Sequence, residues 1–209
     1  MTDALAAGID ALRIDLDRDA RTKLLDYVAL LAKWNATHNL TAIRDADSMI
    51  THHLLDSLAV LPHLPSAETL RLADVGSGGG LPGVPLAIAR PAWRVTLIDS
   101  NRKKAAFLSQ SAIELSLPNV EVACVRAEEF KPASRFDIVI ARAYAALETF
   151  VAQTRHLVAA GGRLLAMKGL RPDDELTRLP PNIRIVEVSP LSVPGVDAAR
   201  HLVIMEVVS

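Results

Sequence analysis

The sequence has 209 residues, of which 50% are hydrophobic and 22% are charged, with a net charge of −1 at pH 7. This balance indicates a globular chain with a sizeable core, and it gives the chain as a whole no electrostatic case for nucleic acid. No apolar run approaches the roughly 20 residues that span a bilayer. The N-terminus lacks the layout of a signal peptide, and the single Cys124 cannot form an internal disulfide. We therefore expect a cytoplasmic protein without a membrane anchor.

The first 62 residues have the periodicity of helices. In residues 18–34, apolar side chains recur at steps of three and four, which predicts a helix capped by Asp17 or Asp19. A loop, "NATHNLTAIRD", follows, and residues 46–61 predict a second helix that ends before Pro62. We expect residues 1–64 to form a helical extension packed on a core of residues 65–209.

From residue 70 onward, short apolar runs alternate with helical patterns. The runs are residues 70–75, 94–99, 120–125, 136–141 and 162–168, and helices are expected at 103–115 and 146–159. This alternation predicts a parallel sheet covered on both faces. Two further runs, 182–191 and 200–208, have no helix between them and predict an antiparallel hairpin. The expected fold class is α/β and Rossmann-like, with a mostly parallel sheet of seven strands.

A glycine-rich stretch, "DVGSGGGLPGVP" at 74–85, joins the first predicted strand to a helix whose first turn holds Pro82. Glycines let backbone N–H groups come close to a ligand, and open α/β sheets bind ligands beyond the carboxyl ends of their strands. Asp99 ends the next predicted strand, 23 residues after Gly76. An acid at about this distance is placed to hold ribose hydroxyls.

Two ligands fit this arrangement. A dinucleotide loop, G-x-G-x-x-G, would need glycine where Leu81 stands, and the absence of that glycine weakens the dinucleotide interpretation. The loop of S-adenosylmethionine (SAM) enzymes is an acid followed by G-x-G-x-G. That pattern is matched here by residues 74–80, which supply Asp74, Gly76, Ser77, Gly78 and Gly80. The segment "RAEEF" at 126–130, which follows the third strand, is a second candidate contact, toward adenine.

Several methyl-transfer chemistries lack the residues that they need. Carbon-5 methylation of a pyrimidine uses a cysteine, but Cys124 falls within a predicted buried strand. Amine methylation commonly uses an Asn/Asp-Pro-Pro-aromatic turn after the fourth strand, where this chain has "ARAYA". The six histidines show no metal-ligand spacing, so no metal is expected. An acceptor that needs little activation remains, such as guanine N7, for which positioning alone is worth about 7–11 kcal/mol.

Seven segments carry a family resemblance: "KWNATHNLTAIRD", "HHLLDSLAV", "DVGSGGGLPGVPLAIARP", "LIDSNRKKAAFL", "ARAYA", "MKG" and "VPGVDAARHLV". In their order and spacing, from about residue 24 to residue 207, the chain resembles the bacterial small-subunit ribosomal RNA methyltransferase G family, also called glucose-inhibited division protein B. The resemblance implies a SAM-dependent enzyme that methylates N7 of one guanosine in the 530 loop of 16S rRNA. The expected partner is that RNA within the small ribosomal subunit or an assembly intermediate.

The resemblance also implies roles for individual residues. The implied SAM contacts are Gly76, Leu81, Ala127, Glu128 and Arg142, and the spacing argument adds Asp99. The RNA-binding candidates are Arg102, Lys103, Lys104, Lys168 and Arg200, which could neutralise phosphates. No acid or base is assigned, and Arg142 and Lys168 are the candidates for positioning the acceptor.

Five more residues are candidates for lining the pocket: Asn39, Thr41, His53, Asp56 and Tyr144. For His53 and Asp56 the preferred interpretation is a buried hydrogen-bonded pair that holds the helices to the sheet. Tyr144 is a candidate for stacking on a base.

Three other functions remain open. The chain could methylate a small molecule or a protein, which a requirement for a large RNA would exclude. It could be a ribosome-assembly or translation factor that transfers no methyl group. A nucleotide-binding oxidoreductase is the third alternative, which Leu81 disfavours.

Overall fold

A computed structural model describes residues 2–208 of the chain. Its seven strands form one sheet in the order β3-β2-β1-β4-β5-β7-β6. The strands from β3 to β5 pair in parallel, and β7 pairs antiparallel with both β5 and β6. The strands are β1 (Arg71–Val75), β2 (Arg94–Ile98), β3 (Val120–Ala123), β4 (Phe136–Arg142), β5 (Val158–Lys168), β6 (Ile183–Pro190) and β7 (His201–Val207). The expected mostly parallel sheet with an antiparallel C-terminal hairpin is confirmed.

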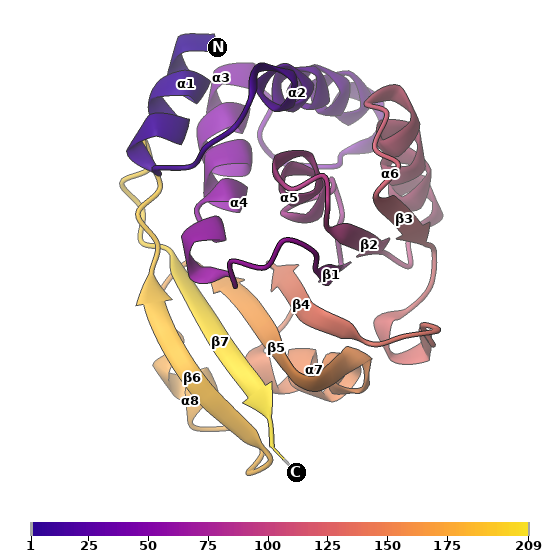
Figure 1. Cartoon of the computed structure of the whole chain (residues 1–209), viewed down its shortest axis with the longest axis vertical. Coiled ribbons are helices and arrows are strands. Elements are labelled where there is room, and N and C mark those ends of the chain that lie inside the picture. Colours follow the sequence, from indigo (N-terminus) through magenta and orange to yellow (C-terminus); the bar gives the residue numbers. More distant parts are fainter. Residues whose placement is uncertain (1, 209) are drawn as a thin grey trace.

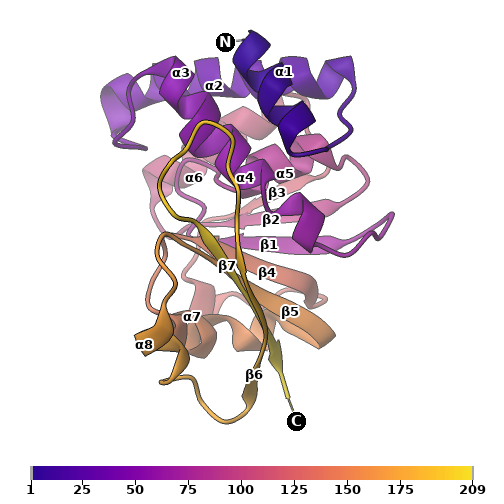
Figure 2. The ribbon, with the colours of Figure 1, turned by 90° about the vertical axis from the view of Figure 1, so that its left-hand side faces the viewer.

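Helices cover the two faces of the sheet, as Figures 1 and 2 show, with α1–α6 on one side of β1 and α7 and α8 on the other. The α-helices are α1 (Thr2–Ala11), α2 (Arg18–His38), α3 (Ala46–Met49), α4 (Asp56–Leu58), α5 (Gly83–Ala89), α6 (Arg102–Glu114), α7 (Leu147–Thr154) and α8 (Asp173–Leu176). A π-helical segment, η1 (Ile50–Leu55), joins α3 to α4. The 3₁₀ turns are η2 (Leu61–His63), η3 (Ala127–Glu129) and η4 (Arg155–Leu157).

Alternating side chains of the strands supply two apolar cores. Leu72 and Ile138 face the core shared with α1, α2, η1, α5 and α6, whereas Ala73 and Val139 face the core that contains α7. Because successive residues of a strand point to opposite faces, nearly every position of β1 and β4 is buried. One core thus includes residues on both sides of position 64, and the expected division there into an extension and a core stays a prediction.

Three local expectations were wrong. The helix expected at 46–61 is interrupted by the wide turn η1, whose His52 carbonyl accepts a hydrogen bond from Arg142 of β4. The helix expected at 146–159 ends earlier, because β5 begins at Val158 rather than at Gly162. Cys124 is exposed, not buried, since β3 is an edge strand that ends at Ala123. Among residues 2–208, no helix is long and apolar enough to cross a membrane.

Candidate functional site

The glycine loop begins where β1 ends and leads into α5, at the carboxyl edge of the sheet. Gly76, Gly78 and Gly80 have φ angles of 69°, 57° and 87°, which favour glycine. The backbone N–H groups of this loop bond within the protein. Those of Gly76 and Ser77 donate to the Ile98 carbonyl, and that of Gly78 donates to Asp99. These three amides therefore have partners at or just after the end of β2, and the expected contact of the loop with a ligand stays a prediction.

Protein atoms explain the missing side chains at two of these glycines. A Cβ at Gly76 would lie 2.4 Å from a ring carbon of Tyr144, and one at Gly80 would lie 2.7 Å from Val84 and 3.3 Å from the Tyr27 hydroxyl. A Cβ at Gly78 would lie 3.7 Å from the Gly76 carbonyl oxygen, which is an ordinary contact, so the positive φ explains why this residue is glycine. The loop is tightly packed from within.

Three residues in or beside the loop that were expected to contact the cofactor, Asp74, Ser77 and Leu81, are buried. Asp74 is 0% exposed, and one carboxylate oxygen, Oδ2, accepts from the Gly83 N–H at 2.9 Å. The Ser77 hydroxyl donates to the Asp74 carbonyl, and Leu81 belongs to the apolar core. Their buried side chains shape the loop, and their expected contact with the cofactor stays a prediction. Burial, opposed by the Gly83 hydrogen bond, raises the pKa of Asp74 to about 7.

A cavity of about 280 Å³ opens in front of Gly76, and we call it the cofactor cavity. Ala127 and Glu128 of η3 line it, as do Asp99 and Tyr144, so it gathers residues from the ends of β1, β2, β3 and β4. The Asp99 carboxylate accepts from the backbone N–H groups of Gly78 and Asn101, at 2.9 and 2.8 Å.

The cofactor cavity fits SAM by its charges. It has two acids, Asp99 and Glu128, and two bases, Lys104 and Arg126. SAM carries a sulfonium, an ammonium and a carboxylate, so it needs partners of both signs. The volume lies just below the usual range of about 300–1,000 Å³ for ligand pockets. A neighbouring cavity of about 340 Å³ shares Ala143 and Tyr144 with it, and the two together give sufficient room.

A second site, the basic cavity, adjoins this region and has a volume of about 390 Å³. Arg142, Lys168 and Arg200 line it, and Ala143 borders both this cavity and the cofactor cavity. Asp56 holds two of the arginines: its oxygens lie 2.8 Å from Arg142 and 3.0 Å from Arg200. Arg142, expected to contact SAM, therefore lies in the basic cavity instead.

The expected pair of His53 and Asp56 is wrong. Both residues are buried, but the Nε2 of His53 lies 2.8 Å from the Thr41 hydroxyl and its Nδ1 lies 2.9 Å from the His52 carbonyl. Burial and the nearby charge of Arg142 lower the pKa of His53 to about 4, so its ring is neutral at pH 7. Asn39 is exposed at the end of α2 and lines neither cavity.

The five RNA-binding candidates separate into three environments. Arg102 and Lys103 are exposed at the start of α6, whereas Lys104 lines the cofactor cavity. Lys168 and Arg200 line the basic cavity. Lys168 donates to Glu175 at 2.8 Å. Burial raises the pKa of Glu175, but the hydrogen bonds from Lys168 and the Leu147 N–H, together with the charges of Lys168 and Arg178, lower that pKa overall.

Several site residues escaped the sequence analysis. Gln153 of α7 accepts from the Tyr144 hydroxyl at 2.6 Å and lines the cofactor cavity, and burial, together with the charge of Glu128, raises the pKa of that phenol. Glu175, on the four-residue helix α8, also accepts from the Leu147 N–H at 2.6 Å. No local pattern distinguishes these residues from surface charges. Arg126 belongs to the "RAEEF" segment that the sequence analysis gave as a candidate contact, although no role was assigned to it individually.

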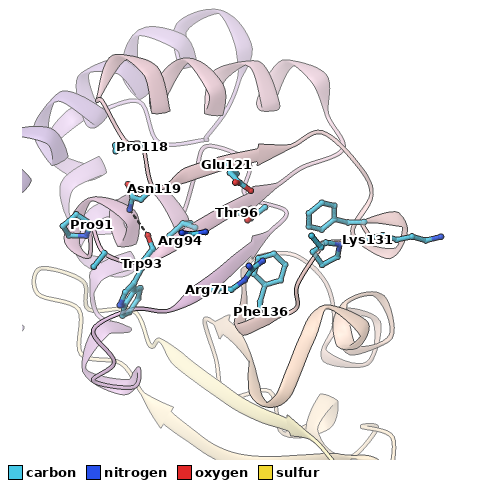
Figure 3. Close-up of a pocket in the computed structure, with 15 residues that line it drawn as sticks. Arg71, Pro91, Trp93, Arg94, Thr96, Pro118, Asn119, Glu121, Lys131 and Phe136 are labelled. Carbon is cyan, nitrogen blue, oxygen red and sulfur yellow. Dashed lines mark hydrogen bonds between the residues drawn. The ribbon is translucent and has the colours of Figure 1, made fainter.

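A larger cavity, about 670 Å³, lies at the opposite, amino end of the strands. Figure 3 shows Arg71 against the Phe136 ring there, with Arg94 and Glu121 nearby. None of the predicted site residues lines it. Within the described part of the chain, no three His, Cys, Asp or Glu side chains gather as metal ligands.

Known proteins share both the sequence and the fold. A family model described as rRNA small subunit methyltransferase G matches residues 20–203. The Ribosomal RNA small subunit methyltransferase G of Aromatoleum aromaticum is 52% identical over 206 residues, covering 97% of each chain.

Two solved structures share the fold at low identity. A SAM-dependent methyltransferase from Aquifex aeolicus has a TM-score of 0.57 and 18% identity, covering 73% of this chain and 90% of its own. The [4+2]-cyclase SpnF has a TM-score of 0.63 and 15% identity, covering 91% and 97%. Because a cyclase shares this fold, the fold alone does not determine the reaction. The near full-length sequence match does identify the family: the chain belongs to the rRNA small subunit methyltransferase G family.

Proposed function

We propose that this protein transfers a methyl group from SAM to N7 of a guanosine in the 530 loop of 16S rRNA, presented by the small ribosomal subunit or an assembly intermediate. Membership of the family makes the chain a SAM-dependent rRNA methyltransferase, an enzyme. The choice of atom, the state of the substrate and a cytoplasmic location go beyond that membership and are part of the proposal.

One observation supports the proposal most strongly: the cofactor cavity and the basic cavity meet at Ala143. A nucleotide in the basic cavity would present its base next to the cofactor, and Lys168 and Arg200 would lie near its phosphates. Ala143 itself has a φ of 51°, a backbone conformation that is rare outside glycine and often found at functional sites.

Bound SAM supplies an electrophilic methyl group. Guanine N7 offers an in-plane lone pair and carries no proton, so the protein needs neither a general base nor a covalent intermediate. The residues of the chain have to bind the acceptor, orient it and exclude water, and such positioning is worth about 7–11 kcal/mol.

Arg142 is the candidate for orienting the guanine. Its Nη1 donates to the His52 carbonyl at 3.0 Å and to Asp56 at 2.8 Å, which fixes the guanidinium. Within the described residues, its Nε and Nη2 make no hydrogen bond, so they remain available for the acceptor edge of a guanine. Asp56 keeps Arg200 beside it.

The test uses small ribosomal subunits from cells that lack this protein, incubated with the enzyme and methyl-labelled SAM. The RNA is digested, and labelled nucleosides are identified by mass spectrometry. We expect label in 7-methylguanosine within one fragment, and less label when deproteinised 16S rRNA replaces the subunit. Label in another nucleoside would refute the N7 assignment. No label, with SAM binding intact, would favour a different acceptor or an assembly factor.

A further inference from the structure

The glycine loop rests on a residue that lies outside the sheet and its crossover helices. Tyr27, on α2, is 0% exposed, and its ring packs near Phe107 of α6 with centroids 6.5 Å apart. Its hydroxyl donates a hydrogen bond to the carbonyl of Gly79, which lies 52 positions further along the chain. Gly79 itself is buried.

That carbonyl depends on Tyr27. Among the described residues, the Gly79 oxygen accepts no other hydrogen bond. A buried carbonyl that loses its donor costs about 1–3 kcal/mol. The phenol remains a donor across the working pH range, because burial raises its pKa further.

The neighbouring loop atoms form a connected unit that transmits this contact. The N–H groups of Gly80 and Leu81 donate to the Ser77 carbonyl at 2.7 and 3.0 Å. The Ser77 N–H in turn donates to the Ile98 carbonyl. Ser77 directly follows Gly76, and Gly76 lines the cofactor cavity. A shift of the Gly79 peptide therefore changes the turn that places Gly76.

Side chains of α2 also fit closely under the loop. A Cβ at Gly79 would lie 3.3 Å from Leu31, and one at Gly80 would lie 3.3 Å from the Tyr27 hydroxyl. On the far side, Asp74 accepts from the Gly83 N–H. The loop is thus held from two directions by side chains that are buried away from the cavity.

We propose that Tyr27 is a positioning residue for SAM: its hydroxyl holds the Gly79 carbonyl so that the glycine loop keeps the shape that the cofactor needs. The inference deepens the proposed function and rests on SAM binding at this loop. It also gives the N-terminal helix α2 a direct part in cofactor binding.

The test compares Tyr27→Phe with Ser111→Ala. Phe removes only the hydroxyl. Ser111 is the matched control, since its buried hydroxyl also donates to a backbone carbonyl, that of Phe107, at 2.9 Å, but it does not touch the glycine loop. Three quantities are measured: the Kd for SAM by calorimetry, the hydrogen exchange of amides 76–81 without SAM, and the melting temperature.

For Tyr27→Phe we expect SAM to bind about tenfold more weakly, corresponding to a 1.4 kcal/mol loss. We also expect faster exchange in the loop, and a raised KM for SAM with kcat recovered at saturation. Ser111→Ala should change the melting temperature little, because Ala is a good helix former, and should bind SAM as the wild type does. The inference is overturned if Tyr27→Phe binds SAM within twofold of the wild type. It is also overturned if both variants lose affinity in proportion to their stability.

The outcomes separate this inference from the proposed function. A wild-type protein that does not bind SAM would overturn both. A wild type that binds SAM and methylates the subunit, with an unaffected Tyr27→Phe variant, would overturn the role of Tyr27 alone.

Discussion

The buried carboxyl of Asp74 makes stability depend on pH in a way that one substitution should reveal. Its pKa rises from an ordinary 3.8 to about 7. Between these values, the native protein keeps a proton that the unfolded chain has released. The free energy of unfolding therefore falls as the pH rises through this window, and the loss is complete above about pH 7. At about 1.36 kcal/mol for each step of one in pKa, the total is roughly 4 kcal/mol.

His53 opposes this change. Its pKa falls from 6.5 to about 4 on folding, so between these values the unfolded chain binds the extra proton. The free energy of unfolding therefore rises with pH over that window, by roughly 3 kcal/mol. The two contributions nearly cancel below pH 6.5, and they hide each other in the wild-type profile.

The change is Asp74→Asn. The amide stays neutral, and its oxygen can still accept from the Gly83 N–H. Relative to the wild type, we expect the variant to gain roughly 4 kcal/mol in free energy of unfolding between pH 4 and pH 8. Urea unfolding at pH intervals of one gives the difference in free energy of unfolding between variant and wild type. For His53→Gln this difference should fall with rising pH instead of increasing. A difference that stays constant within the roughly 10–15% error of extrapolation would refute a neutral Asp74 below pH 7.

Two further predictions concern the cofactor site and the RNA surface beside it. Gly76→Ala and Gly161→Ala both place a Cβ at a positive φ, 69° and 75°, but only the first meets another side chain, since Gly161 has no atom within 4 Å. In urea unfolding Gly161→Ala should cost about 1–2 kcal/mol, and Gly76→Ala should cost more because its Cβ meets Tyr144. Only Gly76→Ala should weaken SAM binding by tenfold or more, as calorimetry would show. Equal SAM affinities would refute the position of the loop. Lys104→Ala should weaken SAM binding because Lys104 lines the cofactor cavity. Joint replacement of Arg102 and Lys103 by Ala should leave SAM affinity unchanged and lower the slope of log RNA affinity against log salt concentration by about 2. An unchanged slope in filter-binding assays would remove α6 from the RNA surface.

Local patterns predicted those parts of the fold that depend on local geometry. The run at 70–75 predicted β1, since a strand buried on both faces reads as a continuous apolar stretch. The glycine-rich stretch predicted a loop between β1 and α5, in which Gly76, Gly78 and Gly80 have positive φ. The sequence could not predict which atoms the loop faces, because that depends on Tyr144 and β2, which become neighbours only after folding.

Partners distant in sequence were the main source of error. Asp56 was matched with His53, three positions away, as helical spacing suggests. Its actual partners are Arg142 and Arg200, 86 and 144 positions away. No local periodicity of the sequence indicates such a pairing, because the pairing forms only when the folded sheet brings the end of β4 and the β6–β7 connection beside α4. The same reasoning applies to Tyr27 and Gly79.

The strand order at the C-terminal edge has a consequence for how the protein is made. β7 lies between β5 and β6, and within the described residues β6 pairs with β7 alone. A chain whose synthesis ends before residue 201 leaves β6 without a neighbour and β5 with an open edge. Unpaired edges invite association with other chains. Chains terminated before that segment should therefore be prone to aggregation and dependent on chaperones, whereas residues 201–207 cover both strands in a single step.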